Sequence, residues 1–300
     1  MSKVMTMKEA ISRFVDSGDT LFVSGAQHGE PAAAMHEIIR QRIGHLSVIC
    51  ALVNTVSFMV GEGLVDTMIT GYSPQDDRRS HAIIKAKKNN PSMVYRESSH
   101  FGIALALHAG QLGIPFIPTR CLVGSDMMKY NDNIGYVNCP FTDEKLGAVR
   151  AVVPDVGILH VQRCDAEGNA QKWGSLGVDQ EGINASKKVI ITTEKIVDPA
   201  VIRSDPNRTI IPAFRVNAVV EVHWGAYPMH LAGCYDGDMF GFMMETGGSE
   251  AYEDFINKYI YGVEDWEGFM KLWREKKGEE YFQNLQIKNP VPSQPIQLGY

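Results

Sequence analysis

The sequence lacks the features that mark membrane proteins, secreted proteins and nucleic-acid-binding proteins. No run of about 18 apolar residues occurs, so we predict no membrane-spanning helix. The N-terminus lacks the apolar core of a signal peptide. The formal net charge is −6, acidic and basic residues are interspersed, and no basic stripe is visible. We therefore expect a cytoplasmic protein that acts neither on a membrane nor on nucleic acid.

Cysteine is also scarce, and its pattern excludes several kinds of site. The five cysteines are scattered and form no Cys-X-X-Cys pair, which is typical of reduced thiols in a cytoplasmic protein. The nine histidines are dispersed without metal-site spacing, and glycine-rich phosphate loops are absent. The sequence therefore predicts no metal and no permanently bound cofactor.

What the sequence does contain is a regular alternation of short apolar segments and helical segments. With 300 residues, 44% of them hydrophobic, the chain can form one large α/β domain or two small ones. The alternation predicts a doubly wound, mostly parallel sheet with flanking helices. No linker divides the chain, so we predict one domain over residues 1–300, with residues 249–300 as C-terminal helices and an extended tail packed on it. Strands are expected at 20–24, 45–51, 66–72, 93–97, 187–194 and 216–222, and helices at 32–40, 56–61, 80–88, 99–112, 250–261 and 265–276.

The central stretch from Cys139 to Asn169 organises this pattern. It holds a predicted strand at 147–153, a Pro-Asp break, and a second predicted strand at 156–162 that is almost continuously apolar. Such a run is typical of a strand covered on both faces, as in a parallel sheet under helices. A tight turn is predicted at 165–169.

The first candidate site is the loop from Gly25 to Pro31, between a predicted strand and a predicted helix. Its backbone N–H groups and the N-terminus of the helix would face the carboxyl edge of the sheet, where α/β proteins bind anions and small ligands. Within this loop His28 could contact a substrate carboxylate or carbonyl, although a lone histidine also serves as a surface or packing residue.

A second candidate lies at the next strand-to-helix junctions. Glu97 ends a predicted strand, and Ser99 and His100 follow at the start of a helix. These groups could be catalytic. A serine at this position can equally cap the helix, and the Glu97 carboxylate can interact with the helix dipole. Tyr72 ends another strand and could contact substrate or pack. Tyr227, which follows a later strand, is a further candidate.

Several ordered motifs resemble one known family. They are the central Pro154-to-Arg163 run, Gly25 with Pro31, Cys139-Pro-Phe, and Gly225-Ala-Tyr-Pro with Tyr235-Asp. Together they look like the α subunit of family I coenzyme A transferases of the glutaconate type, from about Lys3 to about Asp238. The chain departs from the family pattern at Ser24, where relatives have glycine, and at Ala26, where they have phenylalanine.

The resemblance implies an enzyme that acts on an acyl-CoA and a carboxylic or dicarboxylic acid. In such transferases the thioester is attacked by a glutamate of a separate β subunit, and this chain lacks the Ser-Glu-Asn-Gly motif that carries it. The resemblance therefore implies an obligate partner, an α2β2 assembly and an active site shared with the β subunit. Gly25, His28, Tyr72, Ser99, Gly225 and Tyr227 would contact the substrate. Most contacts to CoA would come from the β subunit, although Arg78-Arg79 or the lysines at 85–88 could attract its phosphate.

The sequence leaves two alternative functions open. A ring-cleaving hydrolase branch of the same superfamily uses a glutamate of the α subunit. By this resemblance Glu97 could be the general base of a hydrolase, lyase or decarboxylase, with His100 as its partner. The chain could also be a non-catalytic scaffold or acyl-binding subunit whose partner does the chemistry.

Overall fold

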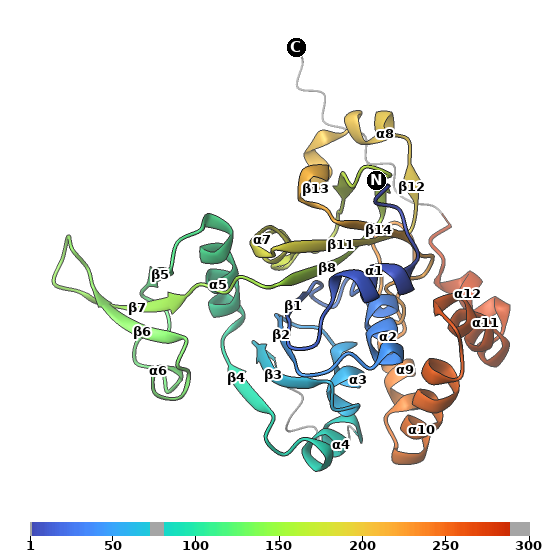
Figure 1. The fold of residues 1–300 in the computed structure, drawn as a ribbon, viewed down its shortest axis with the longest axis horizontal. Coiled ribbons are helices and arrows are strands. Elements are labelled where there is room, and N and C mark those ends of the chain that lie inside the picture. The colour runs from blue at the N-terminus through green and yellow to red at the C-terminus, as the bar shows by residue number, and fades with distance from the viewer. Residues whose placement is uncertain (1, 73–80, 289–300) are drawn as a thin grey trace.

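The computed structural model describes residues 2–72 and 81–288, and a seven-stranded sheet forms its centre (Figure 1). The strand order is β14-β11-β8-β1-β2-β3-β4, and every neighbouring pair is parallel. The predicted parallel sheet is therefore confirmed. Its strands are β1 (Thr20–Val23), β2 (Leu46–Cys50), β3 (Val65–Thr70), β4 (Val94–Glu97), β8 (Val156–Val161), β11 (Lys188–Thr193) and β14 (Ala218–Glu221).

Helices cover both faces of this sheet. Alternate residues of a strand point to opposite faces, so Leu21 and Val23 pack with α2 in one core while Phe22 packs with α5 and α7 in another. The near-continuous apolar strand β8 is buried at all six positions, as predicted. The helices are α1 (Met7–Phe14), α2 (Ala32–Gln41), α3 (Val56–Gly61), α4 (His81–Asn89), α5 (His100–Leu112) and α7 (Asp179–Ala185).

The C-terminal helices join the core on the α2 side of the sheet. Phe255, Phe269 and Trp273 are buried in the same hydrophobic cluster as Leu21. The helix predicted at 265–276 is α11 (Trp266–Lys277), whereas the one predicted at 250–261 is α10 (Ser249–Asp254) continued by a π-helical segment, Phe255–Tyr261. Residues 289–300, predicted to be extended, lie outside the described part of the chain. The sequence did not predict α9 (Met239–Thr246) and α12 (Glu279–Leu285).

A small second sheet follows β8. Its order is β12-β9-β10-β13. The predicted turn at 165–169 is confirmed, because Asp165 Oδ1 accepts hydrogen bonds from the backbone N–H groups of Glu167, Gly168 and Asn169. The elements are β9 (Arg163–Asp165), β10 (Ala170–Gln171), β12 (Ile196–Val197), α8 (Pro199–Arg203) and β13 (Thr209–Ile211).

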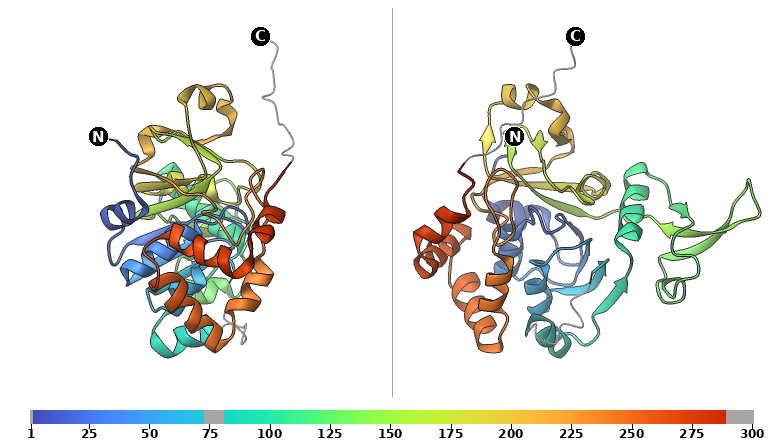
Figure 2. Two further views of the ribbon diagram at one scale, coloured as in Figure 1. Left: turned by 90° about the vertical axis from the view of Figure 1, so that its right-hand side faces the viewer. Right: turned by 180° about the vertical axis from the view of Figure 1, so that it is seen from behind.

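A three-stranded antiparallel sheet projects from the body beside α5, as Figure 1 and the right-hand view of Figure 2 show. We call residues 116–150, which form it, the arm. The strand predicted at 147–153 is β7 (Lys145–Arg150), and it pairs here rather than in the main sheet. The other strands, β5 (Phe116–Thr119) and β6 (Ile134–Asn138), were not predicted, in part because Pro118 breaks the strand pattern and is tolerated only at an edge. The short helix α6 (Met127–Tyr130) connects them.

Within the described residues, no helix is both long enough and apolar enough to cross a bilayer. The five cysteines are all free thiols. A capping box opens α1, with the Thr6 hydroxyl and the Glu9 side chain each bonded to the other's backbone N–H group.

One close approach between α7 and the sheet provides a test of this packing. A Cβ atom added at Gly182 would overlap the ring of Phe22. We predict that Gly182→Ala lowers the free energy of unfolding by about 1–3 kcal/mol, the usual cost of overpacking a core, as measured by urea denaturation. Gly135→Ala is the matched control, because nothing lies within 4 Å of its added Cβ. Equal stability of the two variants would contradict the α7 packing.

Candidate functional site

The strand order places a topological switch point between β1 and β8. From β1 the chain adds β2, β3 and β4 on one side, and from β8 it adds β11 and β14 on the other. The connections that leave the carboxyl ends of β1 and β8 therefore diverge, and in open α/β sheets this is the place where ligands bind. The loop with Gly25 stands at this point.

A buried ion pair holds the Gly25 loop in place. Gly25 has a φ of 111°, and its N–H group donates a 2.7 Å hydrogen bond to Asp179 Oδ1 at the start of α7. Asp179 also pairs with Lys172, and both side chains are fully buried. A Cβ at position 25 would lie 2.7 Å from Cγ of Glu30, so the close turn of the loop requires glycine.

His28 is fully buried and ties three loops together. Its Nδ1 lies 2.8 Å from the carbonyl oxygen of Ser175, and its Nε2 accepts a hydrogen bond from the Ala232 N–H group at 3.0 Å. Burial, then the positive charge of Lys172, lowers the pKa of His28 to about 4. The ring is therefore neutral at pH 7 with both nitrogens occupied, and a contact to substrate would have to displace one of these partners.

Glu30 is a buried carboxyl group that the sequence did not single out. It is fully buried and accepts 3.0 Å hydrogen bonds from the backbone N–H groups of Asn54 and Thr55. Burial raises the pKa of Glu30 to about 7, although these hydrogen bonds oppose the rise. No sequence pattern marks this position, because the donors come from the loop after β2.

The turn at Gly225 is held by Glu194, which follows β11. This carboxylate accepts hydrogen bonds from the N–H groups of Trp224 and Gly225 at 2.9 and 3.1 Å and from the Tyr235 hydroxyl at 2.8 Å. It also lies 3.0 Å from His160 Nε2. Burial raises the pKa of Glu194, but His160 and the other hydrogen bonds outweigh it and leave the pKa lowered.

The Gly225 turn also reaches the first loop. The carbonyl oxygen of Gly225 accepts a 3.0 Å hydrogen bond from the Ala33 N–H group in the first turn of α2. A Cβ at Gly225 would lie 2.6 Å from His160 Cε1, so only glycine fits there. The structure thus brings Gly25, His28 and Gly225 together at the middle of the sheet.

Tyr227 belongs to a different network. Its hydroxyl accepts a 2.8 Å hydrogen bond from Trp273 Nε1 and lies 3.1 Å from the Tyr281 hydroxyl. Burial raises the pKa of Tyr227 to about 12. Its hydroxyl therefore faces the C-terminal helices.

The remaining predicted residues gather at the ends of β3 and β4. Glu97 is exposed at the end of β4, and Ser99 caps α5 by accepting a 2.9 Å hydrogen bond from the Gly102 N–H group. His100 begins α5 and contacts the backbone near Gly71, next to Tyr72, which is 45% exposed. β2 and β3 separate β4 from β1, so at about 4.8 Å per strand this group lies roughly 14 Å along the edge from the Gly25 loop.

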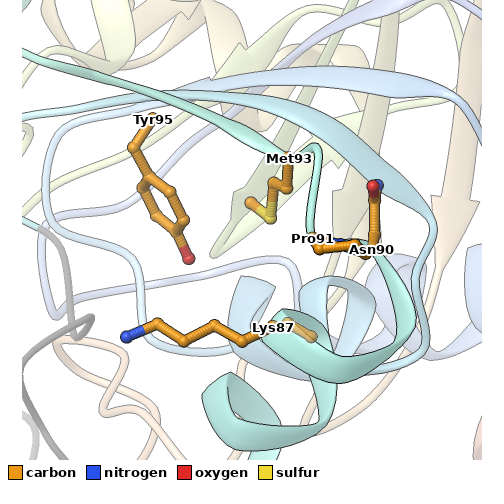
Figure 3. A pocket seen from close by; sticks show the side chains of 6 residues that line it. Lys87, Asn90, Pro91, Met93 and Tyr95 are labelled. Atoms are coloured by element: carbon orange, nitrogen blue, oxygen red, sulfur yellow. The ribbon is translucent and has the colours of Figure 1, made fainter.

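A cavity of about 250 Å³ lies between α4 and β4 (Figure 3). Lys87 and Tyr95 extend along it, while Asn90 and Met93 line the end where the chain enters β4.

Of the basic residues considered for a phosphate, Lys85 forms ion pairs with Glu62 and Glu253, and Arg78 and Arg79 lie outside the described residues. Within the described ranges no three His, Cys, Asp or Glu side chains gather as a metal site.

Comparisons with known proteins identify the family of this chain. A family model described as coenzyme A transferase matches residues 4–222. The A subunit of the 3-oxoadipate CoA-transferase of Pseudomonas knackmussii is 34% identical over 286 residues, covering 92% of this chain and 100% of that protein. The A subunit of the glutaconate CoA-transferase of Acidaminococcus fermentans is 30% identical over 326 residues, covering 100% of this chain and 97% of that protein.

Two solved structures share the fold over most of the chain. The crystal structure of glutaconate coenzyme A-transferase from Acidaminococcus fermentans has a TM-score of 0.83 at 28% identity and covers 97% of this chain and 96% of that one. A decarboxylase designated AibA/AibB has a TM-score of 0.71 at 25% identity and covers 86% of this chain and 100% of that one. Sequence and fold agree, and the chain belongs to the coenzyme A transferase family of enzymes.

Proposed function

We propose that this chain is the α subunit of a heteromeric CoA-transferase that moves CoA between carboxylic or dicarboxylic acids. The observation that carries the proposal is the near full-length similarity to the A subunits of two CoA-transferases, each named for the anion of a dicarboxylic acid. Its substrates would be an acyl-CoA thioester and a free acid, and its partner a β subunit, in an α2β2 assembly.

The state of the two buried carboxyl groups at the switch point supports a nucleophile supplied by the partner. A nucleophilic carboxylate must reach the thioester carbonyl with a free oxygen. Glu30 is fully buried against two backbone N–H groups, and Glu194 is nearly buried among four hydrogen-bond donors. Either one would have to break the loops at the switch point before it could attack. A glutamate on the β subunit meets no such obstacle.

The proposed transfer proceeds through covalent intermediates. An oxygen of the β-subunit glutamate adds to the acyl carbonyl, and the CoA thiolate leaves to give a mixed anhydride. The thiolate then attacks the glutamyl carbonyl, which releases the first acid as its carboxylate and leaves a glutamyl-CoA thioester on the enzyme. The incoming acid reverses these two steps. Backbone N–H donors stabilise the oxyanion formed at each addition.

In this scheme the α subunit supplies one wall of the site. Tyr72, Ser99, Glu97 and His100 lie at the exposed ends of β3 and β4, where they can touch an acyl group held by the partner. The loops of Gly25, His28, Gly225 and Tyr227 are packed and hydrogen-bonded, so they would shape the site through their backbone.

A second function is favoured by one specific observation. Glu97 is an exposed carboxylate at a strand end, and the same scaffold carries the AibA/AibB decarboxylase. In a decarboxylase, lyase or hydrolase, Glu97 would act as a general base with His100 beside it. A β chain without a nucleophilic glutamate would favour this function.

The test of the main proposal is to trap the intermediate. The tagged chain is purified with its bound partner, treated with acyl-CoA and reduced with borohydride, which converts a glutamyl-CoA thioester to the alcohol. We expect peptide mass spectrometry to place the modified glutamate in the partner chain. A modified glutamate in this chain, or turnover without any trapped glutamate, would contradict the transferase proposal.

Glu97 can be tested in the assembled complex. If the second function holds, Glu97→Gln should lower kcat by about 100-fold or more while assembly is kept, because a positioned acid–base group contributes that much. The control is Glu264→Gln, at another exposed glutamate far along the chain. Unchanged turnover of the Glu97 variant would contradict the second function and is the result that the transferase proposal, with its nucleophile on the partner, predicts.

Glu30 predicts a pH dependence of stability. Its folded pKa of about 7 lies above the ordinary value of 4.5, so its contribution to stability is fully present below pH 4.5 and is lost as the pH rises to about 7. Relative to Glu30→Gln, the wild type should lose about 3 kcal/mol of unfolding free energy across this interval. Denaturation of both proteins from pH 4 to 8 measures the difference. Parallel stability curves would show that Glu30 titrates normally.

A further inference from the structure

We propose that the arm, residues 116–150, is the surface on which the β subunit docks. This inference rests on the heteromeric function proposed above. It commits to one occupant, a chain of a different sequence that completes the site at the end of β4.

The arm exposes apolar side chains that its own sheet does not bury. Tyr130 is 85% and Phe141 92% exposed, and Tyr136 is 49% exposed. A small sheet is stable when an apolar face is covered, and here α5 contacts β5 and β7 but leaves these three side chains exposed. Clusters of exposed large apolar side chains mark interaction surfaces.

The outer edge of the arm is a second and independent sign of a partner. Among the described strands β6 pairs with β7 alone, so one side of β6 offers its backbone N–H and C=O groups. Its sequence, Ile-Gly-Tyr-Val-Asn, contains neither a charged residue nor proline. Soluble proteins usually protect an exposed edge with such residues. An edge without them is suited to pairing with a strand of another chain.

The base of the arm is joined to the candidate site, and this identifies the occupant. Asn131 is 7% exposed, and its Nδ2 donates a 2.7 Å hydrogen bond to the backbone carbonyl oxygen of Glu97. Arg96 and Asp132 form an ion pair at 3.6 Å across the same junction. Exposed apolar surface continues beside Glu97 with Phe101, 52% exposed, and Tyr72.

A protein seated on the arm would therefore lie over the ends of β3 and β4. The group that the proposed transfer still needs at that edge is a nucleophilic carboxylate. A second copy of this chain would bring only the same groups again, whereas the β subunit brings the reactive glutamate. The surface thus fits the β subunit, and Asn131 links its docking to the position of Glu97.

The experiment uses, as the β chain, the partner that co-purifies with the tagged chain. The dissociation constant of the two purified chains is measured for the wild type, for Phe141→Glu and for Tyr136→Glu. We expect each arm variant to weaken assembly by at least about 30-fold, the loss caused by a hot-spot residue. Phe214→Glu is the matched control, since Phe214 is 84% exposed but lies outside the arm, and it should bind as the wild type does. Thermal unfolding of each free chain confirms that the variants fold.

A second measurement does not depend on any variant. Hydrogen exchange of the β6 amide groups should slow when the β chain is added. If the arm variants bind normally and β6 exchange is unchanged, the docking proposal is overturned while the proposed function stands. A homodimer of the free chain that Phe141→Glu dissociates would overturn it in favour of a second copy. If the wild-type chain binds no β chain, the proposed function itself fails.

Discussion

The structure depends on the burial of charged and polar side chains beneath the carboxyl ends of its central strands. Asp179 holds the Gly25 N–H group, Glu194 holds the turn at Gly225, and Glu30 holds the loop after β2. Buried polar groups are costly unless they are fully hydrogen-bonded. These carboxylates meet that requirement with partners from the same chain, so they fix the loops of the switch point in one arrangement.

The same burial distinguishes the residues that hold the loops in place from the residues that are free to react. A carboxylate that is saturated with hydrogen bonds stabilises a loop well but reacts poorly, because attack on a thioester would leave its donors unsatisfied. His28 is in the same position, with both ring nitrogens engaged. The exposed, less constrained groups lie instead at the end of β4 around Glu97, where the arm begins. The middle of the sheet edge is therefore buried and hydrogen-bonded, whereas the end of β4 is exposed, an arrangement compatible with the shared active site that we propose.

The alternation of apolar and helical segments was enough to predict the parallel sheet, because each βα unit carries its own local signals. The buried strand predicted at 156–162 and the helix predicted at 99–112, which Gly113 terminates, are examples. The arm could not be predicted in this way, since β5 and β6 are short, partly exposed and paired through non-local contacts. The predicted strand at 147–153 was placed correctly within a few residues, but its partners are in the arm.

The candidate site was predicted only in part for a related reason. Motif positions indicated which loops matter, and the structure groups Tyr72, Glu97, Ser99 and His100 at one edge. Sequence patterns cannot show which side chains turn inward, so Glu30 was overlooked, and packing remained only an alternative for His28 whose partners within the chain could not be identified. Burial is a property of three-dimensional packing, and His28 depends on a donor far away in the sequence, the Ala232 N–H group.

The central claim is that this chain forms half of a reaction chamber that another polypeptide completes. The most direct measurement is a titration of the purified chain with its purified β chain, with acyl transfer followed at each ratio. We expect no transfer by the chain alone and a rate that rises until the two chains are equimolar. Full transfer activity from this chain without any partner would contradict the claim.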